Sequence, residues 1–128
     1  MLTDRRVHAT LPASDLARAR AFYEGTLGFK ARAELPGGVV YSAGDGSVFT
    51  VFPTANRASG THTQAGFTVT EIEKEVAELK AKGVVFEEYD LPDYTTVGSI
   101  ISFPQTRSAW FRDSEGNLLG LVQFATPV

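Results

Sequence analysis

An internal repeat is the sequence feature that most constrains the fold. Two segments each predict a strand, a helix and then three further strands. The positions that correspond in the two copies are His8 and Gln64, Asp15 and Glu71, Gly46 and Gly116, and Thr50 and Gly120. His8 precedes Asp15 by seven residues, and Gln64 precedes Glu71 by the same number. Gly46 precedes Thr50 by four residues, as Gly116 precedes Gly120. A unit of this size cannot enclose a core alone, so the copies are expected to bury their sheets against one another.

The first copy begins with an alternating apolar and polar run at residues 7–11, as expected for a half-buried strand. Ser14 is the expected cap of a helix whose first residue is Asp15. That helix ends at Gly28 and buries one apolar face, made of Leu16, Ala19, Tyr23 and Leu27. The remaining strands are expected at residues 29–35, 39–42 and 47–52.

The second copy predicts strands at residues 64–69, 84–89, 109–112 and 118–124. Thr70 and Glu73 have the spacing of a capping box for its helix, which is expected to end at Gly83. A long segment, residues 90–107, separates two strands that a tight turn joins in the first copy. We therefore expect a single domain over residues 1–128, with modules at about 5–53 and 62–125 and a small, polar linker at 54–61.

Composition narrows the classes of partner. The 128 residues carry 12 Lys and Arg against 15 Asp and Glu, so nucleic acid and an anionic membrane surface are not expected partners. The absence of cysteine excludes disulfides, thiolate metal ligands and cysteine nucleophiles. Apolar residues make up 43%, enough for a core, and no run approaches the roughly 18 residues of a membrane span. We expect a cytoplasmic protein without a signal peptide.

Two groups of motifs carry a family resemblance over nearly the whole chain. The opening motifs are Ser14-Asp15-Leu16, Ala21-Phe22-Tyr23 and Leu27-Gly28-Phe29, and the closing motif runs from Ala109 to Leu119 with the pattern Phe-Arg-Asp-x-x-Gly-Asn. In these motifs the chain resembles the vicinal oxygen chelate superfamily, which holds glyoxalase I, extradiol dioxygenases and bleomycin-resistance proteins. The resemblance implies an α+β fold of two βαβββ modules that form a curved mixed sheet around a cavity, commonly in a dimer.

The fold alone does not determine function in this superfamily. In its metal-using members the ligands lie on the first and last strand of each module, and these positions fall here on His8, Thr50, Gln64 and Gly120. A catalytic divalent metal needs about three firm ligands, usually His or carboxylate. His8 would serve, but Gln64 offers only a weak carbonyl oxygen and Gly120 has no side chain. A cluster that adds His62 still lacks a carboxylate, so we expect no metal and no other cofactor.

The cavity is the expected ligand site. Side-chain alternation places Thr10 with His8, Phe52 with Thr50 and Val122 with Gly120 on shared faces. The segment 90–107 is expected to be an ordered lid, which brings Tyr94 and Trp110 beside a flat or partly apolar molecule. Trp110 and Phe103 can also simply fill the core beneath this segment. The expected binding residues are His8, Thr10, Thr50, Phe52, Gln64, Tyr94, Trp110, Gly120 and Val122.

Gly120 has a particular consequence for the expected cavity. Metal-using relatives place a carboxylate at this position, whereas glycine leaves space. The cavity is therefore expected to be deeper and to admit a larger, less polar ligand. Replacing Gly120 with leucine is expected to fill that space with little loss of stability.

Three functions remain open. The first is a metal-free protein that binds a small, partly apolar or aromatic molecule, similar to drug-sequestering members of the superfamily. The second is a metal-dependent lyase, isomerase or dioxygenase with unusual ligands, which the missing carboxylates disfavour. The third is a metal-independent enzyme with His8 as its catalytic base. The expected partners are a small-molecule ligand and a second copy of the chain in a homodimer.

Overall fold

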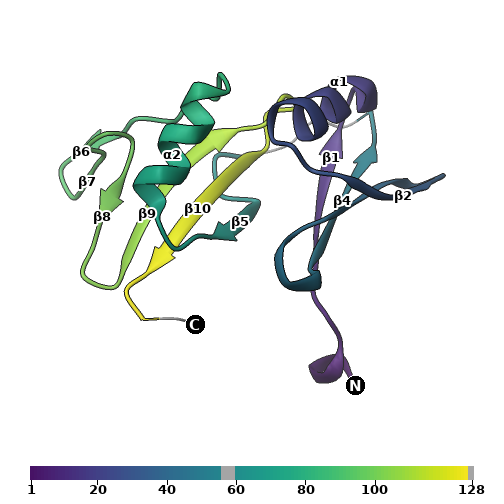
Figure 1. Cartoon of the computed structure of the whole chain (residues 1–128), viewed down its shortest axis with the longest axis horizontal. Helices are drawn as coiled ribbons and strands as arrows, with labels where there is room; N and C mark the ends of the chain where they lie inside the picture. Colours follow the sequence, from purple (N-terminus) through teal and green to yellow (C-terminus); the bar gives the residue numbers. More distant parts are fainter. Residues whose placement is uncertain (56–59, 127–128) are drawn as a thin grey trace.

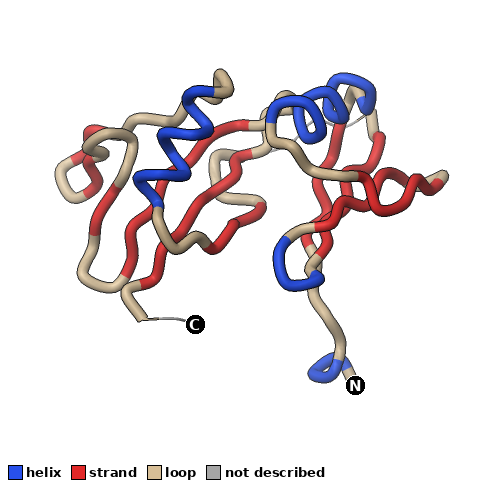
Figure 2. The backbone as a smooth tube through the Cα atoms, in the orientation of Figure 1, coloured by secondary structure: helices blue, strands red, loops and turns tan. Residues whose placement is uncertain are grey.

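The computed structural model describes residues 1–55 and 60–126, and it shows an α+β chain with two four-stranded mixed sheets (Figures 1 and 2). Strands of the first half follow the order β1-β4-β3-β2, and those of the second half follow the order β5-β10-β9-β8. The two sheets lie side by side as separate groups of strands in Figure 1. The predicted fold of two βαβββ modules is confirmed, and each module keeps a sheet of its own. Residues 56–59 of the expected linker lie outside the described residues.

The elements of the first module are β1 (Ala9–Ala13), α1 (Leu16–Arg20), β2 (Ala31–Leu35), β3 (Gly38–Ser42) and β4 (Val48–Pro53), with short helical segments η1 (Leu2–Asp4), η2 (Ala21–Thr26) and η3 (Gly44–Gly46). The π-helix η2 continues α1 without a break. The cap of α1 is Asp15 rather than Ser14, because the Asp15 carboxylate accepts a hydrogen bond from the Arg18 amide at 3.0 Å. β1 starts two residues later than predicted, opposite the start of its parallel partner β4.

The elements of the second module are β5 (Ala65–Thr68), α2 (Ile72–Ala81), β6 (Asp90–Leu91), β7 (Tyr94–Thr95), β8 (Ile101–Ser102), β9 (Thr106–Arg112) and β10 (Leu118–Phe124). The predicted capping box is wrong. Glu71 is the cap of α2 and makes no side-chain cap bond. The Ile72 amide instead donates to Gln123 Oε1 on β10 at 2.8 Å.

The predicted strand at residues 84–89 is also wrong. This segment pairs with β9 only through the bridge between Phe86 and Phe111 and the hydrogen bond from the Glu87 amide to the Trp110 carbonyl at 2.8 Å. β8 takes the outer place in the sheet, and it comes from the segment 90–107. That segment also contains the small hairpin β6–β7, so it is folded β-structure.

The pairing register is the same in both modules. Thr10 lies opposite Thr50 in the parallel pair β1–β4, and Gly66 lies opposite Gly120 in the parallel pair β5–β10. Thr10 and Gly66 follow His8 and Gln64 by two residues in each case, so the register agrees with the correspondence that the repeat predicts. On the adjacent antiparallel strands, Val40 opposes Thr50 and Trp110 opposes Gly120, which makes Val40 and Trp110 corresponding residues.

A single buried cluster joins the two modules. It contains the helix-facing side chains of both sheets, and α2 lies across β9 and β10 in Figure 1. The Phe67 ring of β5 stacks on Phe29 with centroids 5.7 Å apart and meets Phe49 edge-on at 6.0 Å. Such ring pairs add to the burial energy of the apolar surface. Among the residues described, no helix is long and apolar enough to cross a membrane.

Candidate functional site

The closing motif of the chain forms a structural joint between the modules. The Asp113 carboxylate accepts hydrogen bonds from the amides of Glu115 and Asn117 at 2.8 Å each, from Asn117 Nδ2 at 2.7 Å and from the Tyr23 hydroxyl at 2.6 Å. Asn117 Nδ2 also donates to the Pro12 carbonyl at 3.0 Å. Burial and the neighbouring Asp113 raise the pKa of Tyr23. The motif therefore fixes the turn between β9 and β10 against the first module, and it leaves no acidic group there free for chemistry.

Glu115 extends this joint to the start of α1. Its carboxylate accepts hydrogen bonds from the Asp15 amide at 2.9 Å, from Arg18 Nε at 2.7 Å and from Arg18 Nη2 at 3.1 Å. The Glu115 side chain is only 1% exposed, and the hydrogen bond from Arg18 lowers the pKa of Glu115 to about 2. Glu115 is thus an ionised anchor and not a proton donor near neutral pH.

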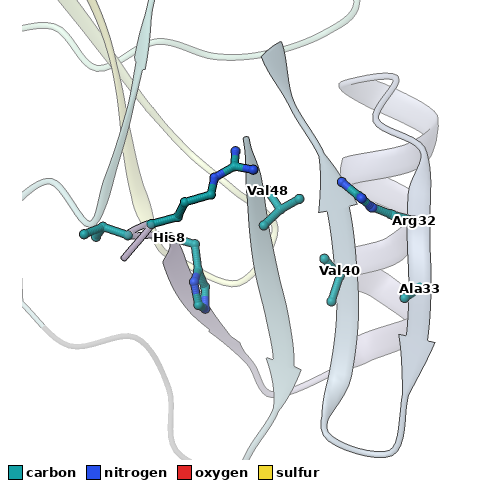
Figure 3. A pocket seen from close by; sticks show the side chains of 7 residues that line it. His8, Arg32, Ala33, Val40 and Val48 are labelled. Carbon is teal, nitrogen blue, oxygen red and sulfur yellow. The ribbon is translucent and has the colours of Figure 1, made fainter. Parts of the chain in front are cut away.

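An open groove crosses the first sheet on the face opposite the buried cluster (Figure 3). Its volume is about 330 Å³, and its lining residues are Arg6, Val7, His8, Arg32, Ala33, Val40 and Val48. Val40 and Val48 form the floor of the groove. Their neighbours along β3 and β4 point into the core, so these two side chains point to the opposite face of the sheet. Figure 3 shows His8 at the β1 side of the groove and Arg32 at the β2 side, with the two valines between them.

A β-bulge in β2 places Arg32 in this groove. The register of β2 against β3 shifts between Ala31 and Ala33. Neighbouring residues of a regular strand point to opposite faces, yet Arg32 and Ala33 both line the groove. A bulge re-aims side chains in this way and is frequent beside functional sites. Arg6 reaches the same groove from the segment before β1, and its guanidinium donates a hydrogen bond to the Gly46 carbonyl.

The predicted residues of the first module lie on or beside the groove. His8 is exposed, lines the groove and makes no hydrogen bond with another side chain in the described parts of the chain. Thr10 and Thr50 are paired residues of β1 and β4 and lie one row further along the same face. Phe52 is half-buried and lies a further row away. Sequence reasoning missed Arg6, Arg32, Val40 and Val48; alternation from Thr50 points to Val48, but no local signal reveals the bulge.

An aromatic cluster lies on the second sheet. The rings of Tyr89, Tyr94 and Trp110 are mutual neighbours, with centroid distances of 5.4, 5.7 and 5.8 Å. Trp110 Nε1 donates to Thr63 Oγ1 at 3.0 Å, and burial raises the pKa of Tyr94. Tyr94 comes from the hairpin β6–β7, so the segment 90–107 does bring it beside Trp110. Phe103 is 49% exposed, so the interpretation that it fills the core is wrong.

The expectation of a deeper cavity at Gly120 is wrong. A Cβ atom added at Gly120 would lie 3.3 Å from Trp110 Cδ1 and Nε1 and 3.3 Å from Thr63 Cγ2. The indole of Trp110 therefore occupies the space that glycine leaves, because the two residues are directly opposed on β9 and β10. Val122 lies two residues further along β10 and is half-buried. A leucine at Gly120 has to displace the indole, so little loss of stability is not expected.

The family ligand positions do not suit a divalent metal. Gln64 Oε1 accepts a hydrogen bond from the Leu118 amide at 3.3 Å, which commits its oxygen to the main chain of β10. Gly120 offers no atom, and Thr50 offers only a hydroxyl. His62 is exposed. Within residues 1–55 and 60–126, no three His, Cys, Asp or Glu side chains are grouped as metal ligands. The side chains at these four positions therefore do not fit a catalytic divalent metal.

The structure does not bring all predicted binding residues together. His8 alone of the predicted set lines the groove of the first sheet. It also lines a smaller cavity of about 160 Å³ between β1 and β5, beside Ala65 and Gly66. In the part of the chain that the structure describes, no hydrogen bond or ring contact joins His8, Thr10, Thr50 or Phe52 to Tyr94 or Trp110.

The fold is an α+β fold of two βαβββ modules. Both modules have the same strand register, and the turn at residues 113–117 fixes them to each other. The family profile of the Glyoxalase/Bleomycin resistance protein/Dioxygenase superfamily matches residues 5–121, and the chain belongs to this superfamily. No protein with a curated description matches the chain significantly.

Solved structures of similar fold are numerous. A superfamily member from Sphaerobacter thermophilus is 25% identical with a TM-score of 0.72, covering 95% of this chain and 99% of that one. TnmS3, an antibiotic binding protein from Streptomyces, is 23% identical with a TM-score of 0.66, covering 95% and 98%. The fosfomycin resistance protein FosX from Listeria monocytogenes is 18% identical with a TM-score of 0.70, covering 94% and 93%.

Proposed function

We propose that this protein binds a small, partly apolar or aromatic molecule without a metal ion. The observation that carries the proposal is the open groove of about 330 Å³ beside His8, which combines a valine floor with polar side chains at its margins. Binding sites for small molecules commonly combine apolar walls with a few polar groups that orient the ligand. The likeness in fold to an antibiotic binding protein and to a fosfomycin resistance protein supports the same class of function.

The metal-free part of the proposal is supported by the donor set. His8 is the one firm ligand among the four family positions. Gln64 is bound to the Leu118 amide, and Gly120 lies against the indole of Trp110. Elemental analysis of the purified protein is expected to give far less than one divalent metal per chain. Near one metal per chain, lost when His8 is replaced by alanine, would contradict this.

Binding is favoured over turnover by the surroundings of His8. A catalytic base is usually oriented by a hydrogen-bond partner, and none holds the imidazole in the described residues. The Asp113 and Glu115 carboxylates are committed to the joint between the modules. His8 is therefore proposed as a group that contacts the ligand, and the His8→Ala variant is expected to weaken binding.

A homodimer is part of the proposal. The groove and the aromatic cluster belong to different modules, and no contact joins them within the described part of one chain. A second copy related by twofold symmetry can place the aromatic cluster of one chain opposite the groove of the other. Sedimentation at micromolar concentration is expected to give about twice the chain mass of 13.8 kDa. A mass of one chain at every concentration tested would contradict the dimer.

The ligand itself can be identified directly. Protein purified under native conditions from its source cells is expected to carry a small molecule that mass spectrometry detects after denaturation. The Val48→Trp variant fills the floor of the groove and is expected to lose that compound while it retains its fold. If the wild-type protein releases no compound, or if the variant retains the same amount, binding in the groove is refuted.

A further inference from the structure

The groove of the first sheet is positively charged in a chain that is acidic overall. Arg6, His8 and Arg32 are among its seven lining residues, and no Asp or Glu is. The whole chain has a formal net charge of −3, so the local balance is opposite to that of the protein. A cleft lined by one sign of charge concentrates ligands of the other sign.

The arginines of the groove lack the carboxylate partners that four other arginines of the described residues have. Arg18, Arg20, Arg107 and Arg112 each form an ion pair with a glutamate. Within the described residues, Arg6 and Arg32 form no such pair. Every Asp and Glu of the sequence lies in the described ranges, so this absence covers all side-chain carboxylates.

The positions of both arginines are determined by the backbone around them. The hydrogen bond to the Gly46 carbonyl holds Arg6 at the groove and leaves further N–H donors of its guanidinium unused. The bulge in β2 turns Arg32 onto the same face. Asp45, the neighbour of Gly46, lines a different cavity on the side of β5 and does not neutralise the groove.

We propose that the ligand of this groove carries an anionic group, a carboxylate, phosphate or phosphonate, on an apolar body. The inference rests on the proposed function and names its ligand class. A guanidinium binds two oxygens of such a group through parallel N–H donors, and the His8 imidazole adds a further donor. The Val40 and Val48 floor takes the apolar part. Because the arginines are exposed, binding is expected to weaken with added salt.

The test is an NMR titration of the full chain with three probes of similar size: benzoate, phenylphosphonate and the neutral benzamide. At low salt, the two anions are expected to shift the amide signals of Val40 and Val48 saturably, and benzamide is expected to bind about tenfold more weakly or worse. Comparison of benzoate with phenylphosphonate shows which anion the groove prefers. Arg32→Gln and Arg6→Gln are each expected to weaken the anions roughly tenfold.

Arg5→Gln is the matched control, since Arg5 is exposed, forms no ion pair in the described residues and does not line the groove. It is expected to leave affinity within about twofold, which separates a local contact from a change in net charge. Arg32→Lys keeps the charge and is expected to recover only part of the affinity.

The possible failures are distinguishable. Equal binding of benzamide and the anions at Val40 and Val48 would overturn the anionic ligand and leave small-molecule binding intact. Equal losses in Arg5→Gln and Arg32→Gln would overturn the local role of the arginines. If neither anion shifts these amide signals, the inference of an anionic ligand is wrong. The proposed function is tested separately, by whether the natively purified protein releases a bound compound.

Discussion

The turns at residues 43–47 and 113–117 occupy corresponding positions in the two modules but make different contacts. The second turn binds the first module through the Asp113 and Glu115 carboxylates. The first turn is bonded within its own module: Ser47 Oγ donates to the Gly44 carbonyl at 2.6 Å, and Arg6 donates to the Gly46 carbonyl. A cavity of about 340 Å³ lies between this turn and β5. Ala43 stands where the second turn has Asp113. The repeated backbone thus places the two turns at corresponding positions. A single residue, Asp113 in place of Ala43, determines that the second turn and not the first is hydrogen-bonded to the other module.

The sheet faces differ in a similar way. Val40 lies opposite Thr50 in the first module, where the groove is open. The corresponding pair of the second module is Trp110 and Gly120, and there the indole covers the glycine. One face therefore keeps room for a molecule, and the other presents an aromatic surface.

Replacing Asp113 with alanine copies the residue of the first turn into the second, and it is expected to have the largest effect. It leaves the buried Tyr23 hydroxyl and the main-chain amide of Asn117 without their acceptor, which is expected to lower the free energy of unfolding by about 3 kcal/mol or more. Urea denaturation followed by circular dichroism measures the change. Asp45→Asn is the control: it removes the carboxylate of the first turn, keeps a residue type that tolerates the positive φ of 54° there, and is expected to cost less than about 0.5 kcal/mol. Similar losses in both variants would remove the distinction between the turns.

Gly120→Leu tests the difference between the sheet faces. The added side chain must displace the Trp110 indole, so a loss of about 1–3 kcal/mol is expected, together with a shift of the tryptophan fluorescence. Thr50→Leu places the same side chain at the corresponding position, beside an open groove, and is expected to cost less. If Gly120→Leu were as stable as the wild type with unchanged fluorescence, the indole would not occupy that space.

The joint is also expected to respond to acid. The folded state lowers the pKa of Glu115 to about 2 from its ordinary 4.5. The stabilisation is therefore complete above about pH 4.5 and is lost as the pH falls towards 2. Glu115→Gln is expected to be less stable than the wild type by about 1–3 kcal/mol at pH 7, and the difference should narrow below pH 4.5. Unfolding free energies from pH 2 to 7 measure this, and a constant difference would refute the anchor.

Thr63→Val is expected to have the smallest effect. It removes the acceptor of Trp110 Nε1 and keeps the shape of the side chain, so a loss of about 1 kcal/mol is expected. A double-mutant cycle with Trp110→Phe isolates the hydrogen bond. A coupling energy near zero would show that the contact does not hold the indole over Gly120.

Local sequence patterns predicted the elements whose contacts lie nearby in the chain. β10 has the predicted bounds, and α2 ends just before Gly83, which adopts a positive φ of 93°. The start of α2 was not predictable, because the acceptor for its Ile72 amide is Gln123, 51 residues away. His8 could be recognised as a candidate from the repeat. The place of Arg32 in the groove could not be predicted from the sequence. It depends on the bulge, which exists only in the pairing of β2 with β3.

The position of Trp110 shows the same limit. The spacing of Trp110 and Gly120 in the sequence does not reveal that the indole covers the glycine. That contact depends on the register of β9 against β10. From the sequence alone, the glycine therefore indicates empty space. The binding roles of Thr10, Thr50, Phe52 and Val122 stay predictions, because no ligand contact tests them.

The bulge in β2 has a consequence for solubility. β2 is an outer strand of the first sheet, and the free amides and carbonyls of such a strand can pair with a strand of another molecule. Here the register break at Arg32 and the exposed Glu34 interrupt the regular hydrogen-bonding edge that fibril growth requires. β8, one of the two outer strands of the second sheet, is only two residues long. The β2 and β8 edges are therefore poor templates for aggregation, even where the protein is concentrated.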